Sequence, residues 1–318
     1  MSLGSNAMRN TPITLRRLLS YHSHLSNPSP LAPPNPAMAL THPTPTPLKI
    51  LMLHGFTQSG PLFHSKTRAL AKHLTRIFPS ISFSYPTGPH RLLAPDLPYA
   101  QTTRDASTAP PPEEAYGWWR RKDTPEGEIS YEGIEEGLER IARTIREEGP
   151  FDGVVGFSQG AAAAAAVAGL LEGEGRVSAF KEAEREGGMP FPASFLDSGR
   201  EGGMVQGPLK FCIVYSGFRA PGDKYKAFYE PRIETKSLHF IGQLDTVVSE
   251  ERSRTLVGCF AGDAEGGTGR VVVIHPGGHF LPSQRPWLDA VAGFLKECLE
   301  RGKEKKAEES VEEMDVPF

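Results

Sequence analysis

The sequence has few cysteines and no long apolar run. Cys212, Cys259 and Cys298 are its three cysteines in 318 residues, and their wide spacing indicates neither a disulfide framework nor a cysteine-based zinc site. No apolar segment approaches the roughly 20 residues that a membrane-spanning helix needs. We therefore expect a protein of a reducing compartment with no integral membrane association.

An excess of charge of either sign is also missing. Lys and Arg number 35 against 38 Asp and Glu, which leaves a net charge of −3, so the charge balance does not favour nucleic acid as a partner. No G-x-G-x-x-G motif follows a predicted strand, so a dinucleotide site has no basis in the sequence.

Acidic residues are absent from the first part of the chain, where the first one is Asp96. Residues 1–47 are rich in Pro, Ser and Thr and contain arginine but no acid, a composition typical of an organelle transit peptide. A disordered extension is the alternative. We expect a cytoplasmic protein, or a mitochondrial one if this segment is a transit peptide. Residues 301–318 are charged and nearly free of apolar residues, which predicts a disordered tail.

The middle of the chain contains alternating strand and helix patterns. Short apolar runs predict buried parallel strands, and segments with helical apolar spacing separate them. We expect strands at 48–53, 81–86, 151–157, 209–218, 237–243 and 270–276, and helices at 62–78, 131–148, after Ser158, and at 284–299. This alternation is typical of an α/β fold with a mostly parallel central sheet and helices on both faces.

Two stretches rich in Gly, Pro and charge, about 87–130 and 173–207, interrupt this alternation. Insertions at strand ends are where such folds build binding sites. We therefore expect one α/β domain over 48–300 with these stretches as two loop-rich insertions.

The pentapeptide Gly156-Phe157-Ser158-Gln159-Gly160 matches G-x-S-x-G. It follows an apolar strand and precedes a helix, which is the setting of a nucleophile elbow. Glycine at the flanking positions leaves room for a tight turn, and a hydroxyl at a helix N-terminus lies where developing negative charge is favoured. A serine that caps the helix is the alternative for the pentapeptide alone.

The helix after this serine is rich in alanine. Alanine favours helix and lets a helix axis approach a sheet closely. We expect the face that contains Ala161, Ala164 and Ala165 to be buried against the sheet.

A serine nucleophile needs a base that takes its proton. After G-x-S-x-G, a carboxylate and then a histidine are expected at the ends of later strands. Asp245 follows one predicted strand and His279 follows the next, in a loop with two glycines. His275 competes, but it lies at the strand end, where a histidine is more often structural. Asp152 and Asp263 do not fit as the acid.

Backbone N–H groups are the expected donors to an oxyanion. One belongs to Gln159, directly after the serine, and the other comes from the loop after the first strand. In that loop, His54-Gly55-Phe56 makes the Phe56 N–H the candidate. His54 is a candidate for a catalytic base or for contact with the substrate, but its position at the strand end favours a supporting hydrogen-bonding role.

Four segments occur in order across 48–299: ILMLHGFTQSGPLFHSKTRAL, GWWR, GVVGFSQGAA, and HFIGQLDTVVSEERS with HPGGHFLP. Together they resemble the FSH-type serine hydrolases of the α/β-hydrolase superfamily. The resemblance implies an α/β-hydrolase fold and hydrolysis of acyl esters or thioesters without a metal or an organic cofactor. It also implies that Ser158, Asp245 and His279 are nucleophile, acid and base. The 173–207 insertion departs from the family pattern and can reshape an acyl pocket.

Aromatic residues near these motifs are candidates for the wall of a substrate site. Trp118 and Trp119 are adjacent, so their side chains do not both face one core and one is expected at a cleft. Burial of both at the edge of the insertion is the alternative. Phe56, Leu62 and Phe63, near the elbow, are further candidates.

These features predict a serine hydrolase that acts on a small-molecule acyl ester or thioester, held free or on a carrier protein, through a covalent acyl-enzyme. A non-catalytic relative that binds an acyl ligand in the same pocket is the alternative. A peptidase is less favoured because nothing in the sequence suggests an extended peptide groove.

Overall fold

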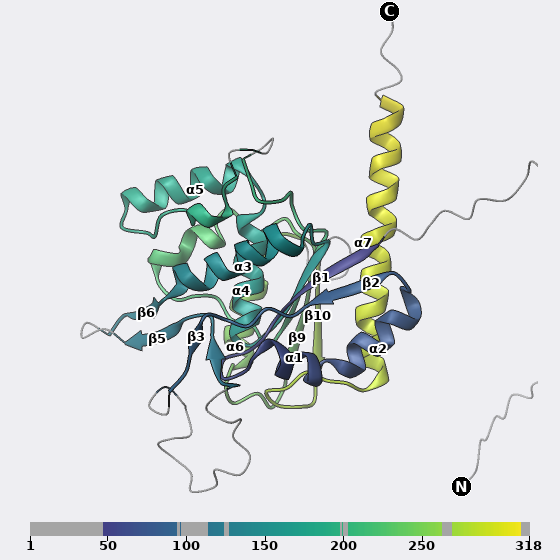
Figure 1. Cartoon of the computed structure of the whole chain (residues 1–318), viewed down its shortest axis with the longest axis horizontal. Coiled ribbons are helices and arrows are strands. Elements are labelled where there is room, and N and C mark those ends of the chain that lie inside the picture. Colours follow the sequence, from purple (N-terminus) through teal and green to yellow (C-terminus); the bar gives the residue numbers. More distant parts are fainter. Residues whose placement is uncertain are drawn as a thin grey trace, which may run out of the picture. The chain divides into compact units, whose positions relative to one another are not determined.

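Six apolar strands form one parallel sheet, in the order β10-β9-β8-β7-β1-β2 (Figure 1). The inner strands are buried almost throughout, as strands covered on both faces are, whereas the edge strands β2 and β10 are only partly buried. The bounds are Leu48–Leu53 for β1, Ile81–Ser84 for β2, Gly153–Phe157 for β7, Phe211–Tyr215 for β8, Ser237–Gly242 for β9 and Arg270–His275 for β10. The expected α/β sheet is confirmed.

This computed structural model describes residues 47–93, 96, 114–123, 127–197, 199, 203–262 and 269–312, with 301–312 as helix backbone alone. Residues 45–318 belong to one compact unit. The expected extension, parts of both insertions and residues 313–318 lie outside the described residues.

Helices cover both faces of the sheet (Figure 1). Alternate side chains of the strands point into two separate apolar clusters, one on each face. The helices of one face are α1 (Gly60–Lys66), α2 (Arg68–Ile77) and α7 (Arg285–Glu312). Those of the other face are α3 (Ile134–Glu148), α4 (Gln159–Leu170), α5 (Glu174–Arg185) and α6 (Glu250–Val257).

The order of strands reverses at β1, which has β2 on one side and β7 on the other. In the register of β1 with β7, Leu53 pairs with Gly156, so the C-terminal ends of these two strands lie side by side. In parallel sheets, ligands bind in the crevice outside the strand ends at such a reversal. The loops that carry Phe56 and Ser158 leave the sheet at this point.

Two short hairpins occupy the described part of the first insertion. β3 (His90–Arg91) pairs with β4 (Tyr116–Gly117), and β5 (Arg120–Asp123) pairs with β6 (Ile129–Glu132), both antiparallel. The helix expected from residue 131 therefore begins only at α3, after Gly133, whose φ of +79° favours glycine.

The helix expected over 62–78 is two helices that meet at Thr67. Both the backbone N–H and the hydroxyl of Thr67 donate to the Phe63 carbonyl oxygen, each at 2.9 Å, which closes the last turn of α1. Thr67 also begins α2, because the N–H of Ala71, in the first turn of that helix, donates to Thr67 O at 2.9 Å.

The second insertion is more regular than the loop-rich stretch that we expect from sequence, because it contains α5 and a 3₁₀ turn, Ala193–Phe195. Arg176 joins α5 to the rest of the fold. Its buried guanidinium donates to the carbonyl oxygens of Gly169 and Ala227 at 3.2 and 3.1 Å, and pairs with Glu172 at 2.8 Å.

The last helix, α7, continues to Glu312, beyond the end expected at Leu299. Its earlier turns pack beside α2 through an apolar face that includes Val291 and Leu295. Among the described residues, no helix combines the length and the apolar character that a membrane crossing requires.

Candidate active site

The turn between β7 and α4 holds Ser158 in a conformation that few side chains adopt. Its φ and ψ are 53° and −117°, a strained region for a residue with a Cβ. A Cβ on Gly156 would lie 2.1 Å from the Gly160 carbonyl oxygen, and a Cβ on Gly160 would lie 2.1 Å from the Leu53 carbonyl oxygen. Only glycine fits at both positions, so the tight elbow expected from G-x-S-x-G is confirmed.

The Ser158 hydroxyl faces His279 and does not cap α4. Its Oγ lies 2.9 Å from His279 Nε2, and its side chain makes no capping hydrogen bond to the helix. The alternative of a serine N-cap is therefore wrong.

His279 is held in turn by Asp245. His279 Nδ1 lies 2.8 Å from Asp245 Oδ2, and a carboxylate can only accept, so Nδ1 carries the proton and Nε2 is left to accept from the serine. The three side chains come from the loops after β7, β9 and β10. The structure thus brings the three residues named from sequence into one hydrogen-bonded chain.

The carboxylate of Asp245 is kept ionised. Its side chain is 1% exposed, and Oδ1 accepts hydrogen bonds from the Val247 and Val248 N–H groups, both at 2.9 Å. Burial acts to raise the pKa of Asp245, but the hydrogen bonds from Val248 and His279 outweigh it and lower the pKa below its usual value. The anion can therefore stabilise an imidazolium at His279.

His275 has the structural position that its place at the strand end predicts. Its buried ring contacts Phe280 and Trp287, and its Nδ1 accepts a hydrogen bond from Gly277 N–H at 3.2 Å. Burial lowers the pKa of His275. It supports the loop that carries His279.

Two N–H groups are available beside the serine. Gln159 is the first residue of α4, and N–H groups of the first turn have no acceptor within the helix. In the loop after β1, the N–H groups of Gly55 and Thr57 are used by Gln58 Oε1 and Tyr116 O. The Phe56 N–H between them has no such acceptor in the described part of the chain.

A cavity of about 570 Å³ opens beside the serine. This volume is in the range of small-molecule sites. Its lining is mostly apolar, with one cation, and consists of Phe56, Thr57, Gln58, Lys66, Phe157, Ser158, Val247, His279, Phe280 and Leu281. Val247 and Phe280 are 59% and 46% exposed, so apolar surface continues from the cavity to solvent.

The other wall residues expected from sequence do not reach this cavity. His54, Phe63, Trp118 and Trp119 have exposed fractions of 3% or less and belong to the core that supports the site. Both tryptophans are buried, which confirms the alternative to a position at a cleft. The Trp118 indole N–H donates to the His54 carbonyl oxygen at 2.9 Å, and the Trp119 ring stacks on Tyr131.

The lining residues that sequence reasoning missed, Thr57, Gln58, Lys66, Val247, Phe280 and Leu281, mostly adjoin the motif residues. Thr57 and Gln58 follow Phe56 directly, and Phe280 and Leu281 follow His279. Their position next to a motif residue is the sequence signal that could identify most of these lining residues. Aromatic character alone points to Phe63, Trp118 and Trp119, which are buried in the core.

His54 is a neutral residue that connects two loops near the site through hydrogen bonds. Its Nδ1–H donates to Gly55 O at 2.8 Å and its Nε2 accepts from Gly88 N–H at 2.9 Å. Burial lowers the pKa of His54 to about 4, so the imidazole is neutral at pH 7. These contacts fit the supporting hydrogen-bonding role expected from sequence, whereas His54 is not among the residues that line the substrate cavity.

The side chain of Gln159 links the elbow to the GWWR segment. Its Oε1 accepts from Trp118 N–H at 2.8 Å and its Nε2 donates to Trp119 O at 2.9 Å. This pairing uses both ends of the amide and holds the residue whose N–H is the expected oxyanion donor.

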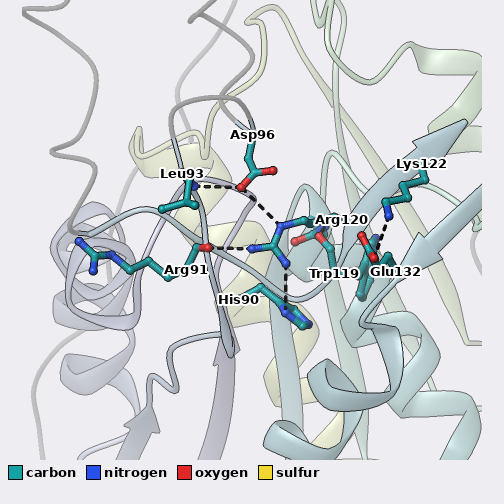
Figure 2. A network of polar contacts seen from close by, with 9 residues as sticks. His90, Arg91, Leu93, Asp96, Trp119, Arg120, Lys122 and Glu132 are labelled. Atoms are coloured by element: carbon teal, nitrogen blue, oxygen red, sulfur yellow. Dashed lines mark hydrogen bonds and ion pairs between the residues drawn. The ribbon is translucent and has the colours of Figure 1, made fainter.

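Arg120 extends the same support to the next strand (Figure 2). Its guanidinium donates to Arg91 O at 2.8 Å and lies 3.4 Å from Asp96 and 3.5 Å from His90 Nδ1. The GWWR segment, far from the serine in sequence, therefore belongs to the scaffold of the site. Within the described ranges, no cluster of three or more His, Cys, Asp or Glu side chains could hold a metal ion.

Comparisons with known proteins identify serine hydrolases and esterases as relatives. The family model described as "Serine hydrolase (FSH1)" matches residues 43–291. "Family of serine hydrolases 3" of Saccharomyces cerevisiae is 32% identical over 271 residues, covering 83% of this chain and 90% of the yeast protein. Human "Esterase OVCA2" is 32% identical over 263 residues, covering 80% of this chain and 98% of the human protein.

Solved structures with a similar fold are more distant. The Zea mays acyl-protein thioesterase 2 structure has a TM-score of 0.48 and 18% identity, and the match covers 80% of this chain and 94% of the maize chain. The family model, in contrast, spans most of the α/β unit, including all three loops that meet at Ser158. The chain belongs to the FSH1 family of serine hydrolases.

Proposed function

We propose that this protein hydrolyses acyl esters or thioesters through a covalent acyl-enzyme on Ser158. The observation that carries the proposal is the hydrogen-bonded chain from Ser158 Oγ to His279 at 2.9 Å and from His279 to Asp245 at 2.8 Å, at the wall of a cavity. Nucleophile, base and orienting acid are the three groups that acyl transfer to a serine needs.

Acylation begins when the Ser158 oxygen attacks the carbonyl carbon and His279 Nε2 takes its proton. Asp245 stabilises the resulting imidazolium through the Nδ1–H bond. The carbonyl oxygen becomes an anion, which accepts from the N–H groups of Phe56 and Gln159. The C–O or C–S bond then breaks, and His279 returns the proton to the leaving alcohol or thiol.

Deacylation repeats these steps with water as the nucleophile. His279 takes a proton from water as its oxygen attacks the acyl carbon, and it then protonates Ser158 Oγ as the acid leaves. The mostly apolar lining of the cavity suits the acyl part of the substrate. The alternative, an acyl-binding protein without catalysis, leaves the alignment of three polar side chains without a purpose.

Parallel assays on oxygen esters and thioesters of the same acyl groups test the proposal and assign the leaving group. We expect turnover by the native chain and a loss of about 10⁶ in kcat for Ser158→Ala. Turnover by neither panel, or equal turnover by the variant, would contradict the proposal. Ser82→Ala, at an exposed serine on β2, is the matched control and should retain full activity.

A further inference from the structure

A second cavity, of about 490 Å³, lies beside the first and has no part in the hydrolysis described above. One loop lines both cavities: Phe56, Thr57 and Gln58 line the first, and Ser59 and Pro61 line the second. The polar side chains of the second cavity are Ser59, Thr87, Glu114, Tyr116, Arg140 and Arg143.

Two arginines supply the charge of this cavity. Arg140 and Arg143 are three residues apart on α3, and this spacing places them on one face of the helix. Arg140 donates to Thr144 Oγ1 at 2.7 Å. Within the described residues, neither guanidinium forms an ion pair with a carboxylate, and arginine stays charged at any ordinary pH.

Two hydroxyl groups of the cavity already accept a hydrogen bond from the backbone. Ser59 Oγ accepts from Leu62 N–H at 3.3 Å, and Thr87 Oγ1 accepts from Gly60 N–H at 3.0 Å. Because each oxygen already accepts, its hydrogen can be donated to a ligand. With the phenol of Tyr116, the cavity presents three hydroxyl groups and two guanidinium groups. Glu114 is the acidic side chain of the described lining, and it is exposed.

Hydrogen bonds from two histidines outside the cavity lining hold the walls of the cavity in place. His54 Nε2 accepts from Gly88 N–H at 2.9 Å, and the His90 ring lies 2.8 Å from the Gly133 carbonyl oxygen, directly before α3. The same His90 ring adjoins the guanidinium of Arg120 (Figure 2). A site whose donors are already positioned loses less entropy when it binds.

We propose that this second cavity binds a phosphate group. Guanidinium pairs match the geometry and charge of phosphate oxygens, and charge-assisted hydrogen bonds are the strong ones. Because one loop lines both cavities, a phosphate held here would lie close to an ester bound at Ser158. The phosphate belongs either to the leaving group of the substrate, which rests on the proposed function, or to a separate phosphorylated molecule.

Calorimetry at low ionic strength measures the binding of inorganic phosphate to the full chain. It tests the site without any hydrolysis. We expect Arg140→Gln and Arg143→Gln each to weaken the affinity at least about tenfold, because each removes charge-assisted hydrogen bonds to the phosphate oxygens. Arg76→Gln, which removes the same charge from an exposed position on α2, should bind as the native chain does. No binding by the native chain, or equal affinity in all four proteins, would overturn the proposal.

Two thioesters with the same acyl group distinguish the sources of the phosphate. If it belongs to the leaving group, butyryl-coenzyme A should have a lower KM than butyryl-N-acetylcysteamine, which lacks the phosphate. Arg140→Gln should then reduce the KM ratio, the KM of butyryl-N-acetylcysteamine divided by that of butyryl-coenzyme A, by about tenfold or more. Binding of inorganic phosphate with an unchanged KM ratio supports the site with a separate phosphorylated ligand. If the native chain hydrolyses neither thioester, a phosphorylated thiol as the leaving group is contradicted, whereas the phosphate site itself is still decided by the independent binding measurement. The proposed function is contradicted only if oxygen esters are not hydrolysed either.

Discussion

At the scale of single residues, the site is a proton path from Ser158 through His279 to Asp245. Asp245 decides which imidazole nitrogen carries the proton, because its carboxylate faces Nδ1 at 2.8 Å and cannot donate. The loop N–H groups of Val247 and Val248 hold this carboxylate in place. The path therefore depends on the charge of Asp245 as well as on its shape.

Asp245→Asn should lower kcat by about 10⁴ with little change in KM. The amide can still accept from the loop N–H groups, but its NH₂ group favours the imidazole tautomer that cannot take the serine proton. Steady-state kinetics on a p-nitrophenyl ester measure both constants. Asp223→Asn, at an exposed residue, is the control, and a kcat within a few-fold of native for Asp245→Asn would refute the assigned role.

His54 makes stability depend on pH. An unfolded histidine has a pKa of about 6.5, whereas burial lowers the pKa of folded His54 to about 4. The unfolded state therefore binds the proton first, so stability is complete above pH 6.5 and falls as the pH drops to about 4, by at most about 3 kcal/mol from this group.

Urea unfolding at a series of pH values measures this dependence. His54→Gln should flatten the fall in unfolding free energy between pH 6.5 and 4, whatever its effect at pH 7. His64→Gln, at an exposed position on α1, should leave the slope unchanged. Identical slopes for native chain and His54→Gln would show that His54 is not buried in its neutral form. His239 and His275, whose pKa values burial also lowers, lose stability in the same range, so the slope does not vanish. Asp245, whose pKa is lowered as well, contributes stability that is lost further into acid.

At the scale of elements, α4 is the support of the nucleophile. The face with Ala161, Ala164 and Ala165 is buried, as predicted, but every other residue of Gln159–Leu170 is buried as well. The helix lies against β7 and β8 on one side, and against α5 and the 3₁₀ turn Asp223–Phe228 elsewhere. Small side chains are needed on every face of this helix because none of its residues is exposed to solvent.

Ala164→Leu should destabilise the fold by about 1–3 kcal/mol or more, because a close-packed site has no room for three further carbons. It should also lower kcat, since α4 begins directly after Ser158. Thermal unfolding and ester turnover report the two effects. Ala69→Leu, at an exposed position on α2, should be close to neutral, and equal behaviour of the two variants would contradict the packing described for α4.

The buried pair of Arg176 and Glu172 joins the second insertion to the fold. Removing one partner of a buried ion pair leaves an unpaired charge and costs about 3–5 kcal/mol. Arg176→Leu should lower the unfolding free energy by this amount in urea titrations, whereas Arg185→Leu, exposed on the same helix, should not. A change below about 1 kcal/mol for Arg176→Leu would mean that the insertion is held by its apolar contacts alone.

At the scale of the whole molecule, the order of strands explains why distant residues meet. Strand and helix patterns predict the six strands and the loops after them, because buried strands and amphipathic helices differ in apolar period. In a parallel sheet all of these loops leave at the same edge, so Ser158, Asp245 and His279 could be placed together from sequence. Their hydrogen bonds follow from that topology.

Other features depend on tertiary packing that a local pattern does not contain. The hairpins β3–β4 and β5–β6 join segments that are short and polar, so no apolar period marks them. Trp118 and Trp119 are aromatic and adjacent, which suggests residues of a substrate cavity. Both are buried, because the Gln159 amide forms hydrogen bonds with their backbone and both rings pack in the core. Burial on all sides of α4 requires helices whose positions the alanine pattern does not specify.

The most direct test of the account is covalent labelling of the full chain with a fluorophosphonate, followed by peptide mapping. The account predicts one adduct, on Ser158, that is lost in Ser158→Ala and strongly slowed in His279→Ala, because the hydroxyl reacts only when its proton is taken. Labelling of a different residue, or no labelling of a folded native chain that also fails to turn over esters, would contradict the assignment of Ser158 as the nucleophile.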